Sequence, residues 1–112
     1  MSLPLIVTQQ ANSDIERNAN WWAQRHSIDD AQRWKAAVHE QLREIQSLPA
    51  SSPLAFENPR FPIEIRQRSV GLRGSGYRAL FTIRKNDILV LTVQRGNQAP
   101  LSQEQLRTML SS

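Results

Sequence analysis

Cysteine is absent from the 112 residues of this chain. The protein can therefore form neither disulfide bonds nor thiolate metal sites, and a reducing cytoplasm is its expected location. Long apolar runs are absent too, because no stretch approaches the ~20 residues that a helix needs to cross a bilayer. Residues 1–5, MSLPL, have no basic segment and no long apolar core, so we predict no signal peptide. These absences argue against a disulfide-stabilised secreted domain and against a membrane-spanning protein.

Repeats and low-complexity tracts are also missing. At this length a single domain, residues 1–112, can bury roughly 60–68% of the surface that the unfolded chain exposes. The two histidines, His26 and His39, have no acidic or serine partner at a recognisable spacing, so we interpret both as structural or solvated. We therefore expect neither a metal ion nor a cofactor.

Basic residues are concentrated in one part of the chain. Residues 60–95 contain eight Lys and Arg against two Asp and Glu, whereas residues 1–59 contain five against seven. An excess of one sign on one segment favours an acidic or polyanionic partner. The alternative is a solvated basic face of a sheet, which is common on protein surfaces.

The basic segment includes residues 71–95, GLRGSGYRALFTIRKNDILVLTVQR, which are typical of a β-hairpin. Two runs rich in β-branched and aromatic residues, Tyr77–Ile83 and Ile88–Val93, flank the short polar link RKND. Alternation along the first strand places Arg78 on the face opposite Tyr77. An arginine in mid-strand either packs its apolar stem against its neighbours or faces a ligand.

Apolar spacing and capping residues predict the other elements. These are a strand at Leu5–Thr8, a helix capped by Asn12 or Ser13, a helix from Ser27 that ends near Pro49, an extended connector at Pro49–Pro62, a strand within Ile63–Val70 and a last helix capped by Ser102 with Gln105. The resulting order, β-α-α-β-β-β-α, predicts an α+β domain with a helical hairpin packed on one face of a small antiparallel sheet.

Side-chain alternation predicts a cluster of arginines on the open face of this sheet. If Ile63, Ile65 and Phe81 face the helices, several arginines of the neighbouring strands point away from them, although a shift of one residue would invert the arrangement. The arginines expected on this face are Arg66, Arg68, Arg78 and Arg84. With Arg73 and Arg95 added, six residues are candidates for binding a partner or nucleic acid: Arg66, Arg68, Arg73, Arg78, Arg84 and Arg95.

The tryptophans have different expected roles. Trp22 and Trp34 fall on the apolar stripes of their helices, so we predict that both belong to the core. Trp21 lies about 100° around the first helix from Trp22 and is expected to be exposed or at an interface.

Several segments together carry a resemblance to a known family. They are LIVTQQANSDIERNANWW at the start, the long amphipathic second helix, LRGSGYRALFTI with its Gly-Tyr-Arg strand, and DILVLTVQR. These segments, over about residues 5–96, are similar to the RelE/ParE toxins of bacterial type II toxin–antitoxin modules. The resemblance implies a toxin, such as the plasmid stabilisation proteins, that a cognate antitoxin binds and neutralises in a hetero-oligomer.

The family contains two activities. RelE-like members cut mRNA on the ribosome with clustered lysines and arginines and a tyrosine or histidine near the C-terminus, whereas ParE-like members bind DNA gyrase. In this chain Arg78 matches the arginine of the Gly-Tyr-Arg strand, but the lysine positions of the preceding strand fall near Ser69 and Gly71. After Val93 there is Arg95 but no tyrosine or histidine.

This incomplete set of residues favours a ParE-like toxin. Cleavage of a phosphodiester needs a group that transfers a proton, and arginine is a poor one because it stays protonated. The alternatives are a RelE-like endonuclease with Arg78 and Arg95 as phosphate and transition-state stabilisers, and a non-toxic module whose basic face binds nucleic acid. The residues do not identify the cellular target, which in the family is DNA gyrase or the ribosome with its mRNA.

Overall fold

A computed structural model describes residues 3–72, 76–96 and 100–111 of the chain. Its helices and strands follow the order β-α-α-β-β-β-α, so the predicted α+β order is confirmed. The strands are β1 (Leu5–Val7), β2 (Arg66–Val70), β3 (Tyr77–Ile83) and β4 (Ile88–Arg95). The helices are α1 (Gln9–Arg25), α2 (Ile28–Ser47) and α3 (Gln103–Leu110), with short 3₁₀ turns at Pro49–Ser51 and Asn58–Arg60.

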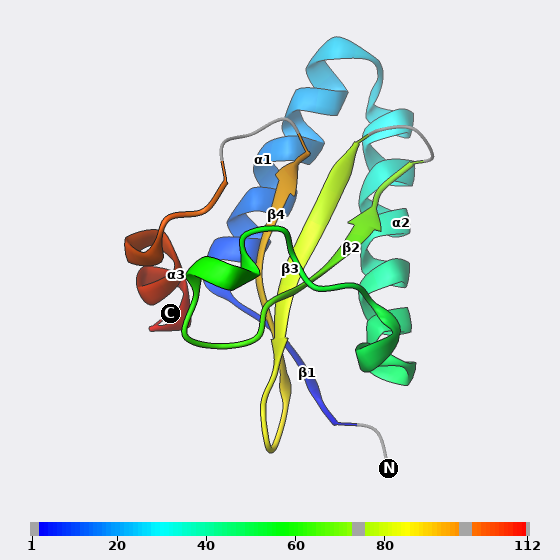
Figure 1. Cartoon of the computed structure of the whole chain (residues 1–112). Helices are drawn as coiled ribbons and strands as arrows, with labels where there is room; N and C mark the ends of the chain where they lie inside the picture. The colour runs from blue at the N-terminus through cyan, green and yellow to red at the C-terminus, as the bar shows by residue number, and fades with distance from the viewer. Residues whose placement is uncertain (1–2, 73–75, 97–99, 112) are drawn as a thin grey trace.

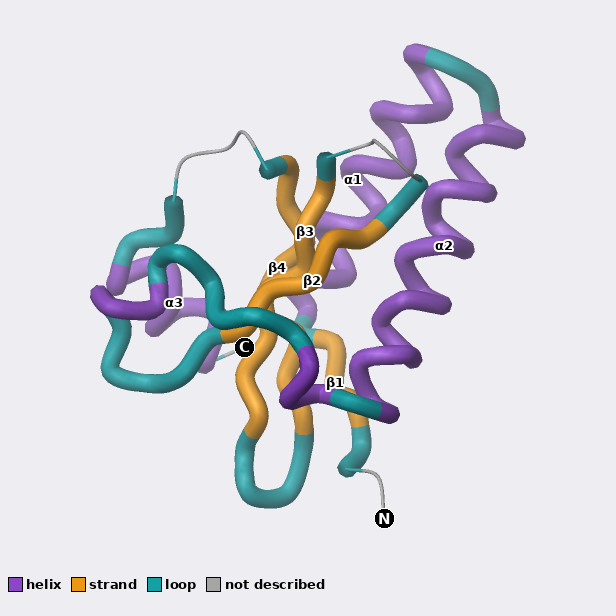
Figure 2. Tube along the Cα trace, turned by 45° about the vertical axis from the view of Figure 1, so that its right-hand side comes forward, coloured by secondary structure: helices purple, strands orange, loops and turns teal. Residues whose placement is uncertain are grey.

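The sheet has the strand order β1-β4-β3-β2 and is covered on both faces (Figure 1 and Figure 2). The helical hairpin of α1 and α2 lies on one face, while α3 and the connector between α2 and β2 lie on the other. Strands β2, β3 and β4 pair antiparallel, whereas β1 pairs in parallel with β4. The parallel pairing is reached by a long crossover, because both helices separate β1 from the other strands.

Two apolar clusters fill the two layers. The first lies between the helical hairpin and the sheet, and its largest side chains are those of Trp34 and Phe81. The second joins the sheet to the connector and α3 through Leu80, Leu91 and Leu106. Alternate residues of β3 and β4 therefore enter different clusters, as is usual for strands that are buried on both faces.

The starts of α2 and α3 confirm the predicted caps. Ser27 Oγ accepts from the N–H of Asp30 at 3.0 Å. Ser102 Oγ accepts from the N–H of Gln105 at 3.1 Å, and the side chain of Gln105 accepts in return from the N–H of Ser102 at 2.8 Å, which completes a capping box. The end of α2 lies just before Pro49, as expected from the restriction that proline places on its preceding residue.

The start of α1 differs from the prediction. Its cap is Thr8, whose hydroxyl oxygen accepts from the N–H of Ala11 at 3.1 Å and whose hydroxyl donates to the carbonyl oxygen of Leu91 at 3.1 Å. One side chain thus ends β1, begins α1 and ties both to β4. The predicted cap at Asn12 or Ser13 is wrong because the bond to β4, which no local pattern shows, fixes where the strand becomes a helix.

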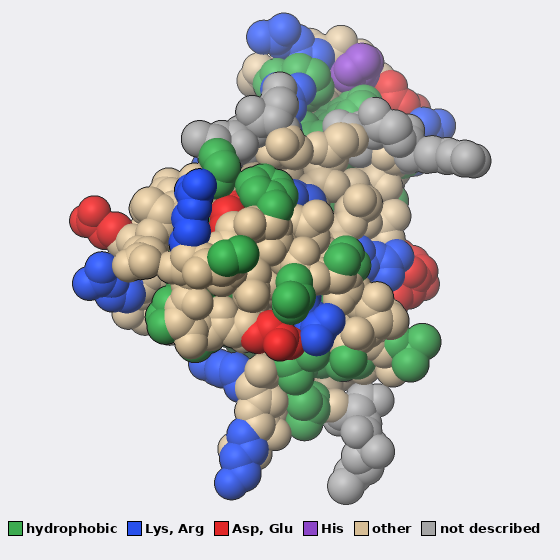
Figure 3. Space-filling view, in the orientation of Figure 1, with side chains coloured by type: hydrophobic (Ala, Val, Ile, Leu, Met, Phe, Trp, Pro, Cys, Tyr) green, Lys and Arg blue, Asp and Glu red, His purple; other side chains and the backbone are tan. Residues whose placement is uncertain are grey.

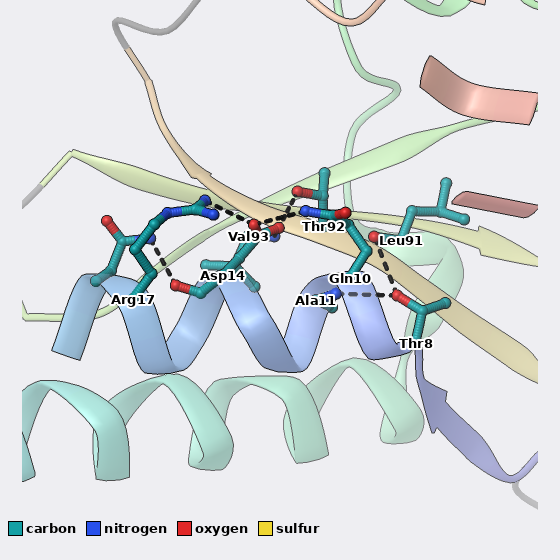
Figure 4. Close-up of polar contacts among 9 residues, drawn as sticks. Thr8, Gln10, Ala11, Asp14, Arg17, Leu91, Thr92 and Val93 are labelled. Atoms are coloured by element: carbon teal, nitrogen blue, oxygen red, sulfur yellow. Dashed lines mark hydrogen bonds and ion pairs between the residues drawn. The ribbon is translucent and has the colours of Figure 1, made fainter. Parts of the chain in front are cut away.

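A buried carboxylate joins α1 to β4 (Figure 4). Asp14 is 2% exposed, and its Oδ2 accepts from the hydroxyl of Thr92 and from the N–H of Val93. Its Oδ1 accepts from Gln10 at 2.9 Å and from Arg17 at 2.7 Å. Because β1 ends before this point, the carboxylate takes the place of a neighbouring strand along the edge of β4.

We expect Asp14→Ala to lower the free energy of unfolding by roughly 3 kcal/mol, because a buried hydroxyl and a buried N–H lose their acceptor. Denaturant unfolding measures this loss. The control is Glu16→Ala, which removes an exposed carboxylate from the same helix and should change stability by less than about 1 kcal/mol. Equal effects of the two substitutions would show that Asp14 does not hold α1 against β4.

Candidate functional site

The register between β2 and β3 separates the arginines that the sequence places on one face. Arg66 lies opposite Phe81 and Arg68 opposite Ala79, so both extend toward the face covered by the helical hairpin. Arg78 extends toward the other face, on which the connector lies. The predicted arginine face is therefore wrong.

The cause of this error is the placement of Ile63 and Ile65. Both pack in the second apolar cluster with Leu80, on the side of the connector and α3. Because side chains alternate along a strand, the neighbouring Arg66 and Arg68 point the other way, toward α2. The sequence-based prediction placed the same isoleucines on the helix side, which inverts the strand.

Each arginine of the predicted open face has a carboxylate partner. The pairs are Arg66 with Glu64 at 2.8 Å, Arg68 with Glu44 at 2.5 Å, Arg78 with Glu57 at 2.6 Å and Arg84 with Asp87 at 2.5 Å. The hydrogen bond from Arg84 keeps the pKa of Asp87 below its ordinary value. Three of these pairs lie at or near the surface, where water screens the attraction, whereas the pair of Arg78 is buried.

Arg78 and Glu57 form a bidentate ion pair inside the protein. Nη1 donates to Oε1 at 2.8 Å and Nη2 donates to Oε2 at 2.6 Å. The two side chains are 7% and 0% exposed. Glu57 belongs to the connector, and its Oε2 also accepts from the N–H of Leu101 at 3.0 Å, just before α3. The pair therefore fastens both segments of the second layer to β3.

Burial alone would raise the pKa of Glu57, because a carboxylate removed from water loses its hydration. Hydrogen bonds from Arg78 and from the N–H of Leu101, together with the charge of Arg78, outweigh this effect and hold the pKa below its ordinary value of 4.5. Glu57 is therefore ionised at neutral pH, and its charge is matched within the protein.

All five N–H groups of Arg78 have acceptors inside the protein. Besides the bonds to Glu57, Nη1 donates to Gln67 Oε1 at 2.9 Å. The amide oxygen of Gln94, oriented toward the guanidinium, accepts from Nη2 at 2.6 Å and from Nε at 3.3 Å. The ring of Phe56 lies over the guanidinium with its centroid 4.2 Å away. No donor of this arginine is left for an external anion.

A groove of about 660 Å³ lies beside this ion pair. Its lining includes Gln41 of α2, Phe56 of the connector, Gln67 of β2 and Tyr77 of β3. The ring of Tyr77 packs edge-on against Trp34, with the centroids 4.9 Å apart, and its hydroxyl oxygen is buried. Arg78 also lines the groove, but its donors are paired inside the protein. The groove therefore presents amides, backbone and aromatic rings rather than an accessible acid or base.

The two other candidate arginines lie elsewhere. Arg95 ends β4 and stacks on the ring of Trp21, 4.3 Å from its centroid. Arg73 lies outside the described residues. Trp34 is fully buried, which confirms the prediction that it belongs to the core, whereas Trp22 is partly buried and packs against the first apolar cluster.

Sequence reasoning missed the partners that surround Arg78. Glu57 lies in the proline-rich connector, where no periodic pattern distinguishes buried positions from exposed ones. Gln67 and Gln94 lie on strands, and a glutamine at such a position is equally compatible with an exposed side chain. Asp14 had a detectable signal, because it lies three residues after Ala11 on the buried side of α1, where a polar residue is unusual.

The described residues contain no group of three or more His, Cys, Asp or Glu side chains placed to hold a metal ion. In the same part of the chain, none of the helices is long and apolar enough to cross a membrane.

Residues 5–100 match the protein family described as "ParE toxin of type II toxin-antitoxin system, parDE". This chain belongs to the ParE toxin family. It is the toxin component of a type II toxin–antitoxin system, and the resemblance to the RelE/ParE toxins is confirmed. No curated protein matches the sequence.

Two solved structures show the fold of this ParE-family toxin. A chain of the "Chromosomal ParDE TA system from P. aeruginosa" has a TM-score of 0.72 and 17% identity, covering 84% of this chain and 96% of that one. A double arginine-to-alanine mutant of the E. coli toxin RelE in the free state has a TM-score of 0.54 and 16% identity, covering 99% and 97%. At such identities the likeness establishes the fold and not the activity.

For this ParE-family toxin, we expect Glu57→Gln to lower the free energy of unfolding by roughly 3–5 kcal/mol, because Arg78 would keep a buried charge without a counter-ion. Arg78→Met should have a similar effect, because it leaves the carboxylate unpaired. The double substitution should destabilise less than the two single losses combined, since neither charge remains. Urea unfolding of the three variants measures this, and purely additive losses would show that the two side chains do not act as a pair.

The stability of the same variants should also depend on pH in a predictable direction. The pKa of Glu57 in the folded state lies below 4.5, so its contribution to stability is fully present above that pH and is lost as the pH falls through the folded pKa. The wild type should therefore lose stability more steeply than Glu57→Gln in acid. The control Glu40→Gln, at an exposed carboxylate of α2, should follow the wild-type curve. Parallel acid curves for wild type and Glu57→Gln would contradict the assignment.

Proposed function

We propose that this toxin acts in the cytoplasm by binding a cellular target and does not cleave RNA. The environment of Arg78 supports this proposal most directly. Arg78 matches the arginine of the Gly-Tyr-Arg strand in RelE-like endonucleases. Here its charge is neutralised by Glu57 and its face is covered by Phe56. A phosphate would have to displace a buried carboxylate before it reached this guanidinium, which is energetically unfavourable.

The groove beside Arg78 also offers no residue suited to proton transfer among its described lining. Tyr77 is there, but its hydroxyl is buried. His39 lies on α2 outside the groove lining, and burial together with the charges of Lys35 and Arg43 lowers its pKa. A general acid or base must come within hydrogen-bond reach of the proton that it moves, so these positions do not support strand cleavage.

Both alternative functions receive less support from this geometry. A RelE-like endonuclease would use Arg78 and Arg95 together, but Arg78 serves the core whereas Arg95 stacks on Trp21. A nucleic-acid-binding module would need several basic side chains along one surface, and the register places those of β2 and β3 on different sides of the sheet. DNA gyrase, the target that the family resemblance implies, is the first candidate.

We expect induction of the toxin without its antitoxin to arrest growth, and purified protein to inhibit DNA supercoiling by gyrase. Primer extension on translated mRNA from the arrested cells should show no induced cleavage sites, because Arg78 is not accessible to a phosphodiester. The control is Arg78→Ala, purified and shown to be folded. Cleavage sites that appear with the wild type and vanish with Arg78→Ala would establish the endonuclease instead.

A cognate antitoxin is the second partner that we propose, and we place its docking along the outer edge of β2. The first half of this edge is already paired with the connector. The N–H of Gln67 donates to the carbonyl oxygen of Pro53 at 2.9 Å, and the N–H of Ala55 donates to that of Ile65 at 2.8 Å. The connector thus occupies the backbone groups at the start of this edge.

Further along the edge, backbone groups become available. The side-chain amide of Gln41 bonds both the N–H and the carbonyl oxygen of Gly71, at 2.6 Å and 3.1 Å, and closes the far end. Between these two closures lies Ser69, which is exposed and whose N–H and carbonyl oxygen point outward by strand alternation. An extended antitoxin segment could pair with this opening by strand addition.

Arg68 precedes Ser69 directly and Arg66 lies two residues earlier on β2, so both are near this opening and would attract an acidic segment. We expect Arg66→Glu with Arg68→Glu to slow antitoxin association and to reduce its dependence on salt, because charges near an interface act mainly on the association rate. Stopped-flow measurements at several salt concentrations test this. Arg84→Glu with Lys85→Glu, at the β3–β4 turn, is the charge-matched control. Equal association rates for the two double variants would place the antitoxin elsewhere.

A further inference from the structure

Strand β1, dark blue in Figure 1, forms one edge of the sheet, because β4 is its single neighbour in the described part of the chain. The carbonyl oxygen of Pro4 accepts from β4 at 2.9 Å, and the N–H of Thr8 donates to β4 at 3.1 Å. Backbone groups alternate in direction along a strand. Those of Ile6 therefore also face β4, whereas those of Leu5 and Val7 point outward from the sheet.

Most of these outward backbone groups have no partner. Within residues 3–72, 76–96 and 100–111, nothing bonds the N–H or the carbonyl oxygen of Leu5 or the N–H of Val7. The carbonyl oxygen of Val7 has one long contact, at 3.5 Å, from the side-chain amide of Asn12. Gln46 closes the edge earlier, by donating to the carbonyl oxygen of Leu3 at 2.8 Å. The open part of this edge is thus Leu5–Val7.

The middle side chain of this open part is apolar and exposed. Leu5 and Val7 pack against the first apolar cluster, so alternation turns Ile6 to the opposite face of the sheet. There Ile6 is 42% exposed. Its register partner on β4 is Leu89, which belongs to the second apolar cluster. Ile6 therefore continues the second cluster to the edge of the sheet, where it lacks full cover.

This edge also lacks the charges that usually protect exposed strands. Residues 1–13 contain no ionisable side chain, and the next residue, Asp14, is buried and bonded internally. Natural sheets commonly protect an edge with charged residues or a covering segment, as the connector does at the start of β2. Elsewhere charges are plentiful: on the face in Figure 3, acidic and basic side chains extend from the top of the molecule to the tip of the β3–β4 hairpin.

We propose that the β1 edge pairs with the same edge of a second copy, so that two toxins form a two-fold dimer with one continuous sheet. A two-fold axis brings each residue near it against its own copy, which a charged edge would oppose and this uncharged edge allows. With the axis at Ile6, Leu5 of each copy faces Val7 of the other, and each of these pairs exchanges both backbone hydrogen bonds. The two Ile6 side chains then cover one another.

The size of the contact sets the expected strength of this dimer. Strand β1 has three residues, so the interface is smaller than the ~1,200 Å² of most stable complexes. We therefore expect association at concentrations on the order of 100 µM and dissociation on dilution. The edge of β2, where we place the antitoxin, lies at the other side of the sheet and stays free. The inference does not depend on the identity of the cellular target.

The absence of cysteine from the chain lets one introduced thiol report on this pairing. Residues that face each other in a non-hydrogen-bonded antiparallel pair have Cα atoms about 4.5 Å apart, which a disulfide can span. We expect Ile6→Cys to form a covalent dimer in oxidised glutathione roughly tenfold faster than Leu54→Cys. The control position lies on the connector and is similarly exposed, at 46%. Non-reducing electrophoresis measures both rates, and the reaction of each thiol with a soluble reagent corrects for its accessibility.

A charge at the axis tests the same pairing without a covalent bond. Ile6→Lys changes an exposed side chain and places two like charges against each other in the dimer. In sedimentation velocity, the average mass of the wild type should rise with concentration, whereas Ile6→Lys should stay monomeric. The control Leu54→Lys adds the same charge on the connector and should associate like the wild type. Circular dichroism confirms that each variant is folded.

Equal oxidation rates of the two cysteine variants would overturn the proposal, as would a wild type that associates no more than Ile6→Lys. The cross-link of Ile6→Cys should persist when the cognate antitoxin is added, because that partner is placed on the β2 edge. Loss of the cross-link on addition of the antitoxin would also overturn the proposal, since the β1 edge would then be an antitoxin surface.

Discussion

The buried ion pair of Glu57 and Arg78 is the interaction on which the second layer of this protein depends. It joins β3 to the connector and to the segment before α3, and Gln67 and Gln94 extend it to both neighbouring strands. Removing two charges from water is costly, and the cost is offset only when every donor and acceptor has a partner. Because the surrounding residues meet this condition, the connector has one defined position across the sheet.

The burial of this ion pair also bears on activity, because proteins that share a fold need not share an activity. A β-hairpin with an arginine in mid-strand is shared with toxins that act on RNA, so the residue type alone allows either chemistry. What decides is the environment of the guanidinium: an arginine whose donors are unpaired can bind a phosphate, whereas one that already binds a buried carboxylate stabilises the protein. In this ParE-family toxin the second description holds. Contacts with other molecules are therefore not expected to use the guanidinium of Arg78.

The edges of the sheet show how those contacts are restricted. Thr8 and Asp14 occupy the part of β4 that β1 leaves uncovered, and Gln41 closes the end of β2. Side chains that take the place of a missing strand prevent the unwanted pairing to which open edges are prone. The opening at Ser69 is a short exception, and it adjoins the groove beside Arg78.

The sequence by itself determined the element order, the hairpin and the caps at Ser27 and Ser102, because periodicity, capping and turn chemistry act over a few residues. Its resemblance to the RelE/ParE toxins indicated the family. The tertiary structure alone decided which face β2 turns to the helices, the cap of α1, and the partner of Arg78. Glu57 lies 21 residues before that arginine, in a segment without periodicity. A one-residue difference in the placement of Ile63 and Ile65 reverses every side chain of β2. Such choices are made by long-range packing and by the matching of buried charges, and neither leaves a local pattern in the chain.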